Sequence, residues 1–171
     1  MNYSGIIEKI RAAGYKITEP LTDEEHEKIK QIYGIEFPTE LLNLYKVGVP
    51  TKKMIPSGGK VICGNPAFYD WHDFSDDNIS RIRSAMDFAY KDKNVPDTAP
   101  KMIPVMSHRY CPQMENEVNI PIFSIYYDDV IIYGKNLEDY VERELRMWDT
   151  HEPVSVNECT RIPYWSDLLV E

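Results

Sequence analysis

The sequence predicts a single α+β domain that spans residues 1–171. Two patterns predict this class: the first part of the chain carries apolar residues at helical spacing between capping residues, and the second part carries short runs rich in β-branched and aromatic residues. The length agrees with one domain, because a chain of this size buries about 70% of the surface that it exposes when unfolded. We therefore expect a hydrophobic core that needs no disulfide bridge or structural metal.

Three helices are expected in the N-terminal part. The first ends at Gly14. The second begins after Thr22, whose hydroxyl can accept a hydrogen bond from the backbone of Glu25 while the Glu25 carboxylate bonds back to Thr22. The third begins after Pro38, because proline presets the backbone of a first helical turn. The apolar faces of these helices consist of Ile6, Ile7, Ile10, Ala13, Ile29, Ile32, Tyr33, Leu41, Leu42, Leu44 and Tyr45.

Residues 50–78 are expected to be irregular, because prolines and glycines interrupt them repeatedly. A short strand over residues 60–63 is the exception. A fourth helix is expected over residues 78–91, where apolar side chains recur at helical spacing. The proline-containing stretch that follows marks a loop.

The second half of the chain is expected to form the sheet. Residues 102–106 predict one strand. Residues 120–127 and 130–133 flank Asp128 and Asp129 at the spacing of a tight hairpin. Aspartate tolerates a positive φ better than most residues, which suits a turn at these two positions.

A last helix is expected after this hairpin. Asn136 can cap its first turn, and Asp139 stands at the capping-box position. The pattern weakens in the C-terminal extension, residues 149–171. Four side chains of the extension are expected to dock onto the domain: Ile162, Trp165, Leu168 and Leu169.

Charge is the strongest compositional signal. The chain has 19 Lys and Arg against 28 Asp and Glu, which gives a formal net charge of −9. Such a charge repels nucleic acid and anionic membranes and attracts a basic protein surface. An acidic surface that only keeps the protein soluble would give the same composition.

The cysteines and the N-terminus indicate a cytoplasmic protein. Cys63, Cys111 and Cys159 are odd in number and far apart, and no Cys-x-x-Cys pair occurs. This usage is typical of a reducing compartment. The first residues lack the basic and apolar regions of a signal peptide, and no apolar run is long enough for a membrane span.

The stretch SHRYCP, residues 107–112, is the most reactive in composition. A Cys–His nucleophile or a metal site would use His108 and Cys111, and a hydrolase or metal enzyme built on them is the remote alternative. Pro112 favours extended backbone, which points side chains three positions apart to opposite faces. We therefore expect Arg109 and Tyr110 to tie a turn to the fold, and we expect neither catalysis nor a cofactor nor a metal.

Binding residues concentrate in loops. An aromatic anchor within an acidic rim is typical of a binding hot spot, and Trp71 and Tyr110 are the candidate anchors. A tryptophan before a helix is also often a core residue, so the core alternative stays open for Trp71. The candidate acidic contacts are Asp73, Asp76, Asp77, Glu115, Glu117, Asp128 and Asp129.

Three segments resemble the SUKH superfamily, which includes bacterial immunity proteins and a fungal cell-wall-assembly regulator of the Smi/Knr type. LTDEEHEKIKQIYGIEFPTELLNLYKV, residues 21–47, resembles the family's opening pair of helices. MIPVMSHRYCP and NIPIFSIYYDDVIIYGKNLEDYVERELR resemble its later strand, hairpin and closing helix. The resemblance covers about residues 18–148, and Val47-Gly48-Val49 departs from the Asn-Gly that many members have after the third helix.

This resemblance implies a mixed, mostly antiparallel sheet flanked by helices, no enzymatic activity and a protein partner. The implied role is that of a cytoplasmic immunity protein, which neutralises a cognate toxin by binding it through an acidic surface. A housekeeping regulator or scaffold of the Smi/Knr type is the alternative. The sequence does not predict the oligomeric state.

Overall fold

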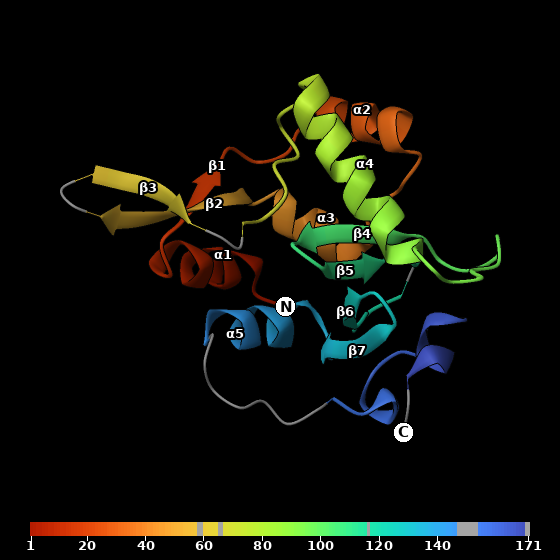
Figure 1. Ribbon diagram of the computed structural model, residues 1–171. Helices are drawn as coiled ribbons and strands as arrows, with labels where there is room; N and C mark the ends of the chain where they lie inside the picture. The colour runs from red at the N-terminus through yellow and green to blue at the C-terminus, as the bar shows by residue number, and fades with distance from the viewer. Residues whose placement is uncertain (58–59, 65–66, 116, 147–153, 170–171) are drawn as a thin grey trace.

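The computed structural model describes residues 1–57, 60–64, 67–115, 117–146 and 154–169, and confirms the α+β class (Figure 1). Helices and strands alternate irregularly along the chain, with two short 3₁₀ helices, η1 and η2, near its end. The elements are α1 Tyr3–Ala12, β1 Tyr15–Thr18, α2 Asp23–Tyr33, α3 Thr39–Tyr45, β2 Val49–Ser57, β3 Lys60–Gly64, α4 Asp76–Tyr90, β4 Met102–Met106, β5 Arg109–Pro112, β6 Ile122–Tyr126, β7 Asp129–Gly134, α5 Leu137–Leu145, η1 Val156–Glu158 and η2 Trp165–Leu168.

The strands form two sheets, of order β1-β2-β3 and β4-β5-β6-β7, where one mixed sheet was expected. Every strand pairing in the described residues is antiparallel. Antiparallel neighbours need only short connections, and the four strands of the second sheet follow one another along the chain. The second sheet is thus built entirely from the region where the sequence predicted strands.

Strand β2 runs through the segment that was expected to be irregular. Its first half pairs with β1 and its second half with β3, and the pairing changes over at Lys53. Pro50 therefore has a strand neighbour only in β1, and Pro56 only in β3. Proline lacks a backbone N–H and is tolerated where a strand needs to pair on one side. These two prolines, which argued against a strand here, thus lie where β2 pairs on one side only.

Both hairpins of the second sheet turn at a non-glycine residue with positive φ. Strands β4 and β5 turn at Ser107–His108, with φ 50° at Ser107. The β6–β7 hairpin was predicted, but its turn is one residue earlier than expected, because Tyr126 pairs with Asp129. Its turn residues are Tyr127, with φ 53°, and Asp128.

The predicted helix starts are confirmed by their caps. The Thr22 hydroxyl accepts from the Glu25 backbone N–H at 3.2 Å, and the Thr22 N–H donates to the Glu25 carboxylate at 2.9 Å. The Asn136 side chain accepts from the Asp139 N–H at 2.9 Å. Helix α4 begins two residues before its expected start, because Ser75 rather than a later residue caps it.

The core lies between the sheets and the helices, and every described helix packs apolar side chains into it. Helices α1 and α5, far apart in the chain, lie side by side (Figure 1). Two fully buried tryptophans, Trp71 and Trp165, are its largest side chains. No helix in the described parts of the chain is long and apolar enough to cross a membrane.

The described part of the C-terminal extension docks onto the domain, as predicted. Ile162 and Trp165 are fully buried, and the indole N–H of Trp165 donates to the Pro100 carbonyl at 2.8 Å. Its ring packs edge-on against Tyr90 at the end of α4. Leu168 and Leu169 are half-buried against the same core.

Candidate functional site

Arg109 and Tyr110 have the structural roles predicted for them. The Arg109 side chain donates to the Glu144 carboxylate at 3.1 Å and to the Ser124 hydroxyl at 2.9 Å. Its guanidinium also lies 3.8 Å from the ring centre of Tyr133. The Tyr110 hydroxyl donates to a backbone carbonyl of α4 at 2.8 Å. The stretch SHRYCP is therefore a turn and a strand fastened to α4 and α5.

His108 and Cys111 do not form a nucleophile with its base. The Cys111 thiol is buried, its sulfur donates to the Pro112 carbonyl at 3.9 Å, and burial raises the pKa of the thiol far above its ordinary value. A protonated buried thiol is a poor nucleophile. The His108 ring instead contacts the Ser107 hydroxyl at 3.1 Å. In the described parts of the chain, no three His, Cys, Asp or Glu side chains are grouped as metal ligands.

Trp71 and Tyr110 are buried, which corrects their prediction as partner anchors. Each is 1% exposed. The Trp71 ring packs edge-on against Phe37 at 5.0 Å and Tyr33 at 5.6 Å between ring centres. A side chain in this environment cannot reach a partner without unfolding the core, so the core alternative describes Trp71.

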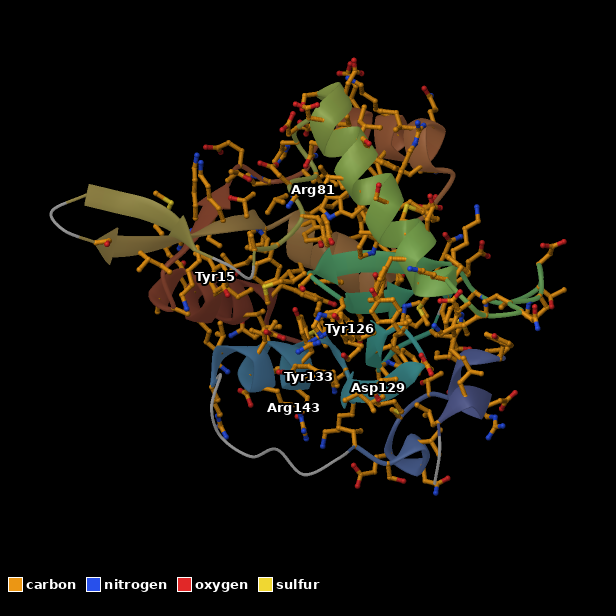
Figure 2. The ribbon with its side chains drawn as sticks, in the orientation of Figure 1. Tyr15, Arg81, Tyr126, Asp129, Tyr133 and Arg143 are labelled. Atoms are coloured by element: carbon orange, nitrogen blue, oxygen red, sulfur yellow. The ribbon has the colours of Figure 1, made fainter. Side chains whose placement is uncertain are left out.

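Asp73 and Asp77 line an open cavity of about 490 Å³ at the start of α4. They share it with Lys16, Lys52 and Arg81, the last of which is labelled on α4 in Figure 2. Carboxylates and cations of the same chain thus both line this cavity, and the α4 entry is a surface of mixed charge.

The remaining acidic candidates lie in two other places. Glu115 and Glu117 are exposed in the loop between β5 and β6, and Asp128 and Asp129 are exposed at the β6–β7 hairpin. Asp76 is exposed beside Asp77 at the first residue of α4. Phe88, near the other end of α4, lies beside Tyr127 of the hairpin, so Asp76 is roughly 18 Å along the helix from the hairpin contact. The structure therefore distributes the predicted carboxylates over three separate sites.

The β6–β7 hairpin carries the exposed aromatic residues that sequence reasoning missed. Tyr126 is 54% exposed, Tyr127 40% and Ile131 46%. They are three of the seven exposed large hydrophobic side chains among the described residues, and all lie within one hairpin. We call these three residues, together with Asp128 and Asp129, the hairpin patch. Tyr126 and Asp129 are labelled in Figure 2.

Ring contacts fix the orientation of the patch. The Tyr126 and Tyr127 ring centres are 4.9 Å apart. Phe88 of α4 lies 5.2 Å from Tyr127, and His108 lies 5.5 Å from Tyr126. The Lys93 ammonium also donates to the Tyr127 backbone carbonyl. Rings held by neighbours lose little conformational entropy on binding a partner.

A signal for the patch was present in the sequence. Phe123 and Ile125 must face the core, so alternation along β6 turns Tyr126 outward. The same alternation along β7 buries Val130 and Ile132 and turns Ile131 outward. Large apolar residues on the outward phase of a strand indicate a contact surface.

No protein-family model, curated protein or solved structure matches the chain.

Proposed function

We propose that the chain is a non-catalytic binding module that binds a basic partner protein through the hairpin patch. The observation that supports this most directly is the grouping of two exposed tyrosines and an exposed isoleucine beside two exposed carboxylates. Tyrosine is enriched at binding hot spots, because its ring contributes a large apolar area and its hydroxyl bonds to water or a partner.

The charge of the chain defines the chemistry of that partner. A net charge of −9 attracts a basic protein and slows the approach of an acidic one. Charge complementarity of this kind raises association rates from about 10⁵–10⁶ to 10⁸–10⁹ M⁻¹s⁻¹ at low salt. Asp128 lies in the turn of the hairpin and Asp129 begins β7, and both carboxylates are exposed to an approaching surface.

The resemblance to the SUKH superfamily supports a more specific role. On this proposal the chain is a cytoplasmic immunity protein, and its partner is a basic toxin domain such as a nuclease whose active site it blocks. A Smi/Knr-type regulator would use the same surface for an endogenous partner. A toxin-like gene beside this one favours immunity, whereas its absence favours regulation.

The test compares three double variants that change the net charge equally: Asp128→Lys/Asp129→Lys, Asp76→Lys/Asp77→Lys and Glu115→Lys/Glu117→Lys. Association and dissociation with a basic protein that co-purifies with the chain from its native host are measured at several salt concentrations. We expect all three variants to slow association, because steering depends on total charge. Only the hairpin variant should also accelerate dissociation, because only it removes direct contacts.

Equal dissociation rates for all three variants would contradict the assignment of the interface to the hairpin patch. Absence of any co-purifying basic protein, from a wild-type chain that is folded, would contradict the immunity role. Circular dichroism of each variant controls for folding, since all six substituted side chains are exposed.

A further inference from the structure

One face of the second sheet already holds a guanidinium between an aromatic ring and a carboxylate. Arg109 lies 3.8 Å from the Tyr133 ring centre and 3.1 Å from the Glu144 carboxylate. It also pairs in register with Ser124 of β6, so its side chain and that of Ser124 are on the same face. The fold thus shows that this face suits an arginine side chain.

A second aromatic–carboxylate pair lies on the same face, one step along β6. Tyr126 is two residues from Ser124, so alternation starts its side chain on the same side, and at the end of the sheet its ring also lies 6.0 Å from Phe88 of α4. Asp129 is the register partner of Tyr126 across the hairpin, which places their β-carbons about 4.5–5.5 Å apart. Figure 2 labels Tyr126, Asp129 and Tyr133 in this part of the molecule.

The two tyrosines of the hairpin patch differ in their contacts with cations. The Lys91 ammonium lies 5.0 Å from the Tyr127 ring centre. In the described ranges of the chain, no Lys or Arg stacks on Tyr126 or forms an ion pair with Asp129. The neighbouring His108 ring lies 5.5 Å from the Tyr126 ring centre; burial and the Arg109 charge lower its pKa, and the Asp129 charge opposes this shift.

We propose that Tyr126 and Asp129 bind an arginine side chain of the partner, with the guanidinium over the Tyr126 ring and hydrogen-bonded to the Asp129 carboxylate. This inference rests on the proposed function, since it names the group that the hairpin patch recognises. Arginine fits better than lysine, because its planar guanidinium both stacks on a ring and donates two hydrogen bonds to one carboxylate.

The probe is an acetylated and amidated Gly-Arg-Gly peptide, compared with its lysine and citrulline counterparts. Binding is followed by NMR through the Tyr126 ring and Asp129 resonances in the full chain. We expect saturable shifts with the arginine peptide, smaller shifts with lysine and none with citrulline, which has the same shape without the charge.

Two matched comparisons separate the roles of the ring and the carboxylate. Tyr126→Leu keeps an apolar side chain but removes the ring, and should weaken arginine binding roughly two- to fivefold, whereas Tyr126→Phe should preserve it. Asp129→Asn should weaken binding more than Asp128→Asn, which removes the same charge one residue away.

Equal shifts with citrulline, or equal binding by Tyr126→Leu and the wild type, would overturn the arginine assignment. The outcomes for the two proposals are distinguishable. If a basic protein binds through the hairpin patch but the arginine peptide does not bind, this inference is refuted and the proposed function remains intact. If the arginine peptide binds but no basic protein binds the chain, the proposed function is refuted instead.

Discussion

At the scale of single residues, one guanidinium joins the strand that carries it to three other elements of the fold. Arg109 on β5 contacts Ser124 on β6, Tyr133 on β7 and Glu144 on α5. Arg109 and Glu144 are both largely buried. A buried ion pair adds little net stability over an apolar pair, but removing Arg109 alone takes away a cation and hydrogen-bond donor that faces the buried Glu144 carboxylate.

Arg109→Met is therefore expected to lower the free energy of unfolding by about 3–5 kcal/mol, measured by urea denaturation. The double variant Arg109→Met/Glu144→Leu removes both charges and should be more stable than the single variant. Additive losses in the two single variants and the double variant would show that the pair is not coupled.

At the scale of elements, His72 joins the start of α2 to the loop that precedes α4. Its Nδ1 lies 2.8 Å from the Glu25 carboxylate and its Nε2 lies 2.9 Å from the Glu19 carbonyl. Burial lowers the pKa of His72, but the hydrogen bonds to Glu25 and Glu19 outweigh burial and raise it above 6.5. The imidazolium therefore stabilises the fold more than the neutral ring does.

This junction predicts a pH dependence of stability. A raised pKa in the folded state adds stability below pH 6.5, and that stability is lost as the pH rises through the folded pKa. His72→Gln should remove this dependence from urea denaturation measured across the neutral range. His26→Gln is the contrasting control, because burial lowers the pKa of His26 and its contribution changes with pH in the opposite sense. Identical profiles for His72→Gln and the wild type would contradict the assignment.

Local signals explain which elements the sequence predicted. The caps at Thr22 and Asn136 act within three residues of chain, so they can be read without knowing the fold. Strand β2 depends on partners in β1 and β3 that no local pattern specifies. Its prolines were therefore interpreted as breaks, and β1 was not expected at all.

The candidate site was predicted in part. Asp128 and Asp129 were named, and they lie in the hairpin patch, but Trp71 was chosen as an anchor for its residue type rather than its position on an element. Exposure depends on which side of a strand faces the core. The one-residue shift of the turn changed the register at the hairpin tip, and it placed Tyr127 rather than Asp129 in the turn.

At the scale of the whole molecule, the described part of the C-terminal extension, residues 154–169, contributes to the core. Trp165 is fully buried, contacts Tyr90 at the end of α4 and donates to the Pro100 carbonyl. Thr160 donates to the Val118 carbonyl in the β5–β6 loop. These contacts connect the described part of the extension with the segments that precede the β4–β5 and β6–β7 hairpins.

Trp165→Ala is therefore expected to destabilise the whole domain by about 3–5 kcal/mol in urea denaturation, because it leaves a large cavity and removes the bond to Pro100. Leu169→Ala, at a half-buried position, is the control and should cost less. A Trp165→Ala effect no larger than that of Leu169→Ala would mean that the extension is only loosely attached.

The turn at Tyr127 has one more consequence. A φ of 53° costs a tyrosine about 1–2 kcal/mol, and a glycine would adopt it freely. The Tyr127 ring is 40% exposed, and its ring and cation contacts among the described residues are with Phe88, Tyr126 and Lys91, none of which is fully buried. Tyr127→Gly should therefore relieve this backbone strain and remove a ring that is 40% exposed to a partner, so stability and partner binding should change in opposite directions.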